Sequence, residues 1–143
     1  MKMPCDLLAV ACLVSLGLPL AAQAPETYKG RLAPVPVDAQ LLPNTAGHGN
    51  ASVALAGAKL TVSGTFEGLR GPATSAQLRR GLAIGVRGPA LYDLTVTKAA
   101  SGTISGSFDL TPEQIDGLRK GRLYVQIDSE KAPDGNLWGW LLK

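Results

Sequence analysis

Hydrophobic and polar residues alternate along much of this chain, most clearly near its C-terminal end. Between residues 121 and 143, two alternating segments flank a Pro-Asp-Gly turn. The inward positions of these segments are Leu123, Val125, Ile127, Leu137, Gly139 and Leu141. A period of two residues is typical of β-strands that bury one face. The pattern therefore predicts a closing hairpin with an aliphatic inner face.

Shorter alternating segments precede this hairpin, with glycine and proline between them. We expect strands over residues 28–32, 51–56, 59–66, 75–80, 91–97 and 103–110. The second and third of these are joined by Gly57-Ala58 and form a hairpin. Many short strands separated by turns are typical of two packed sheets. The sequence therefore predicts an all-β fold, an antiparallel, Greek-key-like β-sandwich of about eight strands.

One short helix is expected before the closing hairpin. Thr111 suits the N-cap, Pro112 the first helical position, and Gln114 the third position of a capping box. Gly121 is a suitable stop signal just after the last turn. The helix has about two turns, and we expect it to cover one end of the sheets.

The first 24 residues have the pattern of a secretory signal peptide. Lys2 precedes a nearly continuous apolar run from Leu7 to Leu20, and small residues follow. Cleavage after Ala22 or after Ala24 fits the small-residue rule, which leaves residues 25–143 as one domain. The apolar run is too short for a spanning helix. We therefore expect a secreted or periplasmic protein with no transmembrane span in the mature chain and no lipid anchor.

Composition limits the chemistry of the mature chain. Cys5 and Cys12 both lie in the predicted signal peptide, so neither disulfides nor thiolate chemistry are expected. The net charge of +3 is spread along the chain, which argues against a nucleic-acid partner. His48 is the single histidine, and no spacing pairs it with a nucleophile. The sequence therefore predicts no enzyme activity and no cofactor.

Several short motifs occur in an order that resembles the CHRD (chordin-type) domain family, as in a bacterial exported member. They span Tyr28 to Leu142 and include Tyr28-Lys29-Gly30-Arg31-Leu32, Gly64-Thr65-Phe66-Glu67-Gly68-Leu69, Gly71-Pro72-Ala73-Thr74-Ser75-Ala76, Leu110-Thr111-Pro112-Glu113-Gln114 and Pro133-Asp134-Gly135-Asn136. The resemblance implies a secreted all-β domain. It also implies kinship with extracellular binding modules of signalling antagonists and with exported bacterial proteins.

The chain departs from this family at positions where relatives often carry histidine. Gln77, Arg79 and Asp128 stand at those positions. Arginine stays protonated and does not bind metals, so the metal set of histidine-rich relatives is not reproduced, and no metal site is expected. The last strand also departs, because Trp138 and Trp140 replace polar residues of the family pattern.

These departures define the candidate binding residues. We expect Tyr124 and Asp128 to lie opposite Trp138 and Trp140 on the outer face of the hairpin, with Gln77 and Arg79 on a neighbouring strand. An exposed aromatic face marks a partner or ligand surface. The alternative is that the N-terminal segment or the loop over residues 81–89 covers the tryptophans as ordinary core.

Three functions stay open from the sequence. The first is a non-enzymatic binding module for an extracytoplasmic protein or glycan, with contacts from the residues just named. The second is a metal-binding protein with redox activity on a sandwich resembling copper–zinc dismutases, which would need ligands besides His48. The third is a structural envelope component without a ligand.

Overall fold

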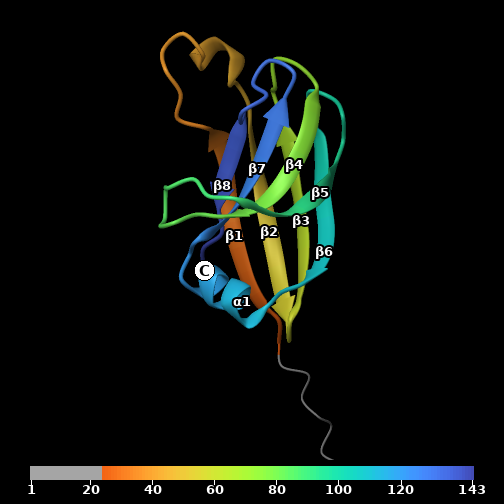
Figure 1. Cartoon of the computed structure of the whole chain (residues 1–143). Helices are drawn as coiled ribbons and strands as arrows, with labels where there is room; N and C mark the ends of the chain where they lie inside the picture. Colours follow the sequence, from red (N-terminus) through yellow and green to blue (C-terminus); the bar gives the residue numbers. More distant parts are fainter. Residues whose placement is uncertain (1–23) are drawn as a thin grey trace, which may run out of the picture.

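The computed structural model describes residues 24–143, and the predicted signal peptide therefore lies outside the described residues except for Ala24. Eight strands, one α-helix (α1) and one short 3-10 helix (η1) follow one another along the chain (Figure 1). Their bounds are β1 Glu26–Pro34, η1 Leu42–Asn44, β2 His48–Ala56, β3 Lys59–Glu67, β4 Ala73–Arg80, β5 Ala90–Val96, β6 Gly102–Asp109, α1 Pro112–Arg119, β7 Leu123–Ser129 and β8 Leu137–Trp140. Each predicted strand and the predicted helix are present.

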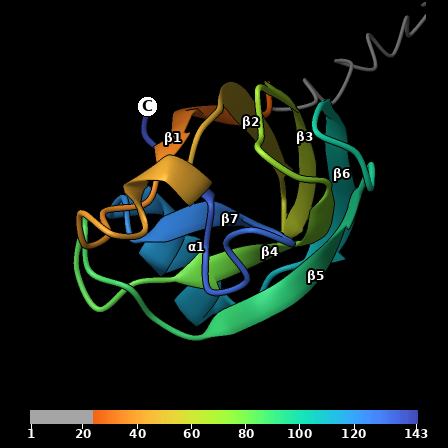
Figure 2. The ribbon, with the colours of Figure 1, turned by 90° about the horizontal axis from the view of Figure 1, so that it is seen from above.

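The all-β antiparallel class with eight strands and one short α-helix is as predicted, but the strands form one closed barrel, so the predicted β-sandwich is wrong. Their order around the barrel is β1-β2-β3-β6-β5-β4-β7-β8, and every pair is antiparallel (Figure 2). β7 lies beside β4 after the run β4-β5-β6, which is a Greek-key connection, as the sequence predicts. Two seams are short: β1 meets β8 through two residue pairs, and β5 meets β6 through two. The barrel therefore consists of two well-paired sheets that also join at their edges.

Two glycines allow the β1–β8 seam to close. A Cβ atom on Gly30 would lie 2.7 Å from the carbonyl oxygen of Trp140. A Cβ atom on Gly139 would lie 2.9 Å from Leu32 Cδ2 and 3.0 Å from the carbonyl oxygen of Arg31. Glycine in a strand often marks such a close approach of two backbones. Alternation along single strands reveals which face is buried, but not that two edges approach this closely.

The inner face of the barrel holds the main core. The predicted inward residues Leu123, Val125, Ile127, Leu137 and Leu141 are all fully buried. In an eight-stranded barrel, side chains fill the interior. β7 differs from the other strands because all seven of its residues are buried, on the outer face as well as the inner one. Something outside the barrel must therefore cover β7.

The helix α1 has the predicted ends and lies at one end of the barrel (Figure 1). Thr111 Oγ1 accepts from the backbone N–H of Gln114, and the Gln114 side chain accepts from the backbone N–H of Thr111. Gly121 follows the helix with a φ of 72°, which suits glycine. The long loop between β1 and β2 lies at the opposite end (Figure 1). Within residues 24–143, no helix is both long and apolar enough to cross a membrane.

Candidate binding site

The residues that the sequence singles out come together on the outer face of β4, β7 and β8. Arg79, Tyr124 and Trp140 form one row across the three strands. Gln77, Gln126 and Trp138 form the next row. Asp128 continues this face beside Ser75 of β4. We call this surface the outer face; its role in binding stays a prediction.

Aromatic rings pack together on the outer face. Tyr124 stacks on Trp140 with ring centroids 4.4 Å apart, and Trp138 meets both rings edge-on at 5.8 and 5.5 Å. Edge-on and offset stacks are the favoured arrangements of aromatic rings. Tyr124 is 0% exposed, whereas the two tryptophans are half-buried. A ligand on this face is therefore able to touch the tryptophans, but not Tyr124.

The loop between β4 and β5, residues 81–89, covers the aromatic rings. The backbone N–H of Gly88 donates to Tyr124 Oη at 3.1 Å. A Cβ atom on Gly81 would lie 2.5 Å from Trp140 Cη2, so only glycine fits against this ring. The sequence leaves open whether the tryptophans are exposed or covered. In the structure the 81–89 loop covers them in part, and both stay half-buried.

The polar residues of the outer face form two separate hydrogen-bonded groups. Asp128 accepts from Gln126 Nε2 and from Ser75 Oγ, both at 2.8 Å. Arg79 donates to Gln77 Oε1 at 2.7 Å and to the carbonyl oxygen of Gly88 at 3.1 Å. Arg79 and Asp128 therefore do not pair with each other. Each holds its own neighbours in place.

Two buried polar atoms of the outer face have no hydrogen-bond partner among residues 24–143. They are Gln126 Oε1 and Trp140 Nε1. Buried polar atoms are nearly always hydrogen-bonded, because a group left without a partner costs free energy. The outer face is therefore a partly satisfied polar and aromatic layer, unlike the aliphatic interior of the barrel.

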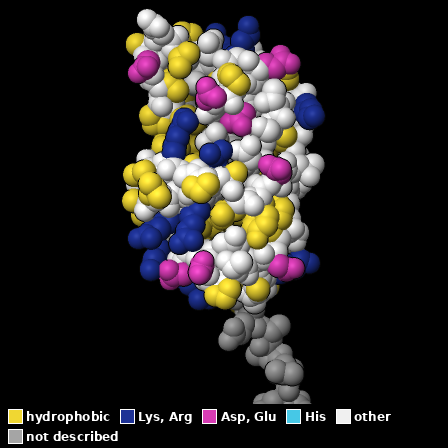
Figure 3. Space-filling view, in the orientation of Figure 1, with side chains coloured by type: hydrophobic (Ala, Val, Ile, Leu, Met, Phe, Trp, Pro, Cys, Tyr) yellow, Lys and Arg dark blue, Asp and Glu magenta, His cyan; other side chains and the backbone are white. Residues whose placement is uncertain are grey.

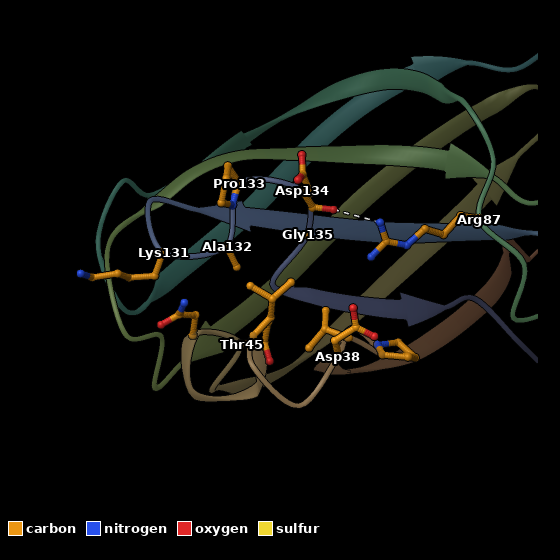
Figure 4. Close-up of a pocket in the computed structure, with 12 residues that line it drawn as sticks. Asp38, Thr45, Arg87, Lys131, Ala132, Pro133, Asp134 and Gly135 are labelled. Carbon is orange, nitrogen blue, oxygen red and sulfur yellow. Dashed lines mark hydrogen bonds between the residues drawn. The ribbon is translucent and has the colours of Figure 1, made fainter.

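A groove of about 680 Å³ lies next to the outer face (Figure 4). Its walls come from loops at the end of the barrel opposite α1 (Figure 1). One wall is the β1–β2 loop, with Pro36, Val37, Asp38, Leu41, Asn44 and Thr45, and the other is the β7–β8 turn, residues 131–135. Arg87 reaches the groove from the 81–89 loop and donates to the carbonyl oxygen of Asp134 at 3.0 Å (Figure 4). The groove thus combines apolar side chains with two carboxylates, Asp38 and Asp134, and two cations, Arg87 and Lys131.

A buried asparagine ties the two walls together. Asn136 is 0% exposed and accepts from Ser129 Oγ at 2.8 Å. Its Nδ2 donates to the carbonyl oxygen of Ala46 at 2.8 Å. The backbone carbonyl oxygen of Asn136 accepts from the backbone N–H of Val35 at 3.0 Å. Both ends of the β1–β2 loop are therefore fixed to the start of β8. We call this arrangement the Asn136 clamp.

The groove and the outer face are in contact at Gly135. A Cβ atom on Gly135 would lie 3.2 Å from both Arg87 Nη2 and Gln126 Nε2. Gly135 has a φ of 131°, a conformation that favours glycine. The turn therefore rests directly on Gln126, and the outer-face residues support one wall of the groove.

Sequence reasoning missed the groove residues Asp38, Arg87, Lys131, Asp134 and the clamp residue Asn136. The Pro-Asp-Gly-Asn run predicts a turn, but nothing local shows what faces it. The clamp joins positions 90 residues apart, and such a contact leaves no periodic pattern in the sequence.

The ionisable groups with shifted pKa values lie around the α1 end of the barrel, away from the groove. Arg119 and Tyr28 both donate to Glu26, and these hydrogen bonds lower the Glu26 pKa from 4.5 to about 2. Burial raises the pKa of Tyr28, and the hydrogen bond to Glu26 adds to this effect. The Lys120 ion pair lowers the pKa of Asp116. Glu26 with Arg119 and Asp116 with Lys120 are therefore surface ion pairs, and the buried Tyr28 adds a hydroxyl donor to the first.

The single histidine, His48, has a possible metal-binding neighbour, Glu67. His48 Nε2 lies 2.7 Å from Glu67 Oε1, and both side chains are exposed. Within residues 24–143, no three His, Cys, Asp or Glu side chains lie close enough together to hold a metal ion. The metal-dependent alternative thus gains no support from the geometry.

A comparison with protein-family models matches residues 34–141 to the CHRD domain. The match runs from the end of β1 to the residue after β8, so it includes both walls of the groove and the whole outer face. No curated protein and no solved structure shows significant similarity to the chain.

Proposed function

This chain belongs to the CHRD domain family, and from that membership we propose that it is a non-enzymatic binding module that acts outside the cytoplasm. The signal-peptide pattern of residues 1–24 supports export, either to the periplasm or beyond the cell. The absence of cysteine from residues 25–143 means that the barrel depends on packing for its stability.

The groove beside the outer face is the binding site in this proposal. Its lining carries the observation that supports the role: charges of both signs stand among apolar side chains between two walls that are fixed to each other. Concave sites with apolar walls and a few placed polar groups are typical ligand sites. Mixed charges favour a segment of polypeptide, which offers both acidic and basic groups, over a polyanion or a purely apolar ligand.

The outer face has a supporting role. Gln126 packs under Gly135, and Asp128 holds Gln126 through its amide. The half-buried Trp138 and Trp140 add apolar surface that a longer ligand is able to reach. Tyr124, Gln77 and Arg79 fix the covering loop and the strand beside it.

A peptide-display selection on immobilised residues 25–143 tests the proposal. The groove variant reverses two charges, Asp38→Lys with Lys131→Glu, which preserves the net charge. The matched control reverses Lys59→Glu with Asp109→Lys, an exposed cross-strand pair near the α1 end. We expect enriched peptides to bind the wild type and the control but not the groove variant. Equal binding to all three proteins, or no enrichment, would contradict a peptide-binding groove, and binding on a glycan array instead would replace the peptide with a sugar.

A further inference from the structure

The loop that covers the outer face also carries apolar side chains outward. Leu82, Ile84 and Val86 are 75%, 58% and 45% exposed. Leu142, near the C-terminal end, is 44% exposed. These four are most of the large exposed hydrophobic side chains among residues 24–143; the other two, Leu41 and Leu42, lie in the β1–β2 loop. Large apolar side chains in such number on one small surface need an explanation.

Three of these side chains stand on one short loop and the fourth, Leu142, lies beside Ile84, so we call the four the apolar loop patch (Leu82, Ile84, Val86 and Leu142). A Cβ atom on Gly121 would lie 2.7 Å from Leu142 Cδ2 and 3.2 Å from Ile84 Cδ1, so both side chains lie over this glycine. The loop projects from the side of the barrel (Figure 1). In the space-filling view, hydrophobic side chains protrude at the same place (Figure 3).

The loop backbone is held from within, so the exposure of its side chains is built into the fold. The N–H of Gly81 donates to the carbonyl oxygen of Arg122 at 2.7 Å, and the N–H of Arg80 donates to Pro89 at 3.1 Å. Within the loop, the N–H of Val86 donates to Ala83 at 3.1 Å, which closes a small turn at the tip. These hydrogen bonds hold the loop in one conformation, in which its apolar side chains stay exposed to water.

Positive charge surrounds the apolar loop patch. The three chain segments that build it, residues 80–89, 117–124 and 137–143, contain no Asp or Glu. Their cations are Arg80, Arg87, Arg119, Lys120, Arg122 and Lys143. Glu26 pairs with Arg119 and Asp116 with Lys120, and no other salt bridge within 4.0 Å joins these cations to a carboxylate of residues 24–143. Asp116 also interacts at longer range with Arg80 and Arg122, and Glu26 with Lys143, so the cations outnumber the nearby carboxylates without being free of them. Lys and Arg side chains gather above and below the protruding apolar loop (Figure 3).

From this arrangement we propose that the apolar loop patch docks on an anionic phospholipid bilayer. Leu82, Ile84 and Val86 enter the boundary between headgroups and acyl chains, while the surrounding cations contact lipid phosphates. Interfacial binding of this kind combines apolar insertion with attraction to anionic lipids. A narrow projecting loop with a cationic surround fits a bilayer better than a protein partner, because a protein interface needs a broader complementary surface. This inference does not depend on the peptide groove.

Vesicle co-sedimentation of residues 25–143 tests the proposal. The probes are vesicles of phosphatidylcholine alone and of phosphatidylcholine with phosphatidylglycerol. The test variant is Leu82→Ser with Ile84→Ser, both at exposed positions where the fold is not expected to suffer. The control is Leu42→Ser, which removes the same kind of exposed apolar surface elsewhere; Leu42 is 55% exposed in the wild type and does not line the groove.

We expect the wild type and the control to bind the anionic vesicles and to release them as salt rises. The loop variant should partition at least about tenfold more weakly, because two apolar side chains no longer enter the bilayer. Absence of wild-type binding to anionic vesicles, or equal binding by the loop variant, would overturn the proposal. A wild-type dimer in solution that Ile84→Ser converts to a monomer would also overturn it, since the patch would then be a contact between two copies.

Discussion

Removing the side chain of Asn136 should destabilise the fold, because this side chain joins the two walls of the groove. The Asn136→Ala variant loses the hydrogen bond from Ser129 Oγ and the one to the carbonyl oxygen of Ala46. Because Ser129 and Asn136 are both 0% exposed, water cannot replace the bond from Ser129 Oγ without opening the structure, whereas Ala46 is half-buried. A lost bond costs about 1–2 kcal/mol when a buried partner is left unpaired, and less at a half-buried one. We therefore expect the free energy of unfolding to fall by about 1.5–3 kcal/mol.

Urea denaturation measures this loss, and amide hydrogen exchange shows where it acts. In Asn136→Ala, amides of the β1–β2 loop should exchange faster, since Ala46 is no longer held to β8. The control Ser129→Ala keeps the bond to Ala46, so it should lower stability without loosening that loop. Unfolding free energy of Asn136→Ala within about 0.5 kcal/mol of the wild type, or unchanged exchange in the loop, would refute the clamp.

Three further predictions concern the α1 end of the barrel, the β1–β8 seam and the outer face. Glu26→Gln removes a carboxylate whose pKa is lowered from 4.5 to about 2, mainly by Arg119. Ionised Glu26 stabilises the folded state fully above about pH 4.5. In urea denaturation at a series of pH values, the difference in unfolding free energy between wild type and variant should be constant there and should vanish as the pH falls through about 2. Gly139→Ala brings a methyl group within 2.9 Å of Leu32 Cδ2, so urea denaturation should show a loss of about 1–3 kcal/mol; an unchanged midpoint would mean that the seam is loose. The two tryptophans of β8 are half-buried, so their fluorescence should be quenched by acrylamide only in part, and quenching equal to that of free tryptophan would contradict the loop cover.

The strands and the helix follow from local patterns in the sequence. Alternation identifies the buried faces of β7 and β8, and Thr111 with Gln114 identifies the helix start. The sequence predicts that Tyr124 and Asp128 lie opposite the two tryptophans on one face of the closing hairpin. In the structure Tyr124 pairs with Trp140 on that face, whereas the partner of Trp138 is Gln126 and not Asp128. Each of these inferences uses residues that are close in the chain, where side-chain period and capping determine the conformation.

Barrel closure and the groove could not be predicted in the same way. Closure depends on Gly30 and Gly139, whose role appears only when β1 lies against β8. The groove needs Asp38 and Asp134 on two segments that meet through the Asn136 clamp. Such contacts join distant parts of the chain and depend on the three-dimensional arrangement rather than on any pattern of neighbouring residues.

Amide chemical shifts show directly whether a bound peptide lies in the groove. Isotope-labelled residues 25–143 are titrated with a peptide enriched on the wild-type protein. The shifted amides should cluster in the β1–β2 loop, in residues 131–135 and at Arg87, the segments that line the groove. Shift changes confined to the 81–86 tip, to the β2–β3 side of the barrel or to the α1 end would contradict the claim that this CHRD domain binds its partner in the groove.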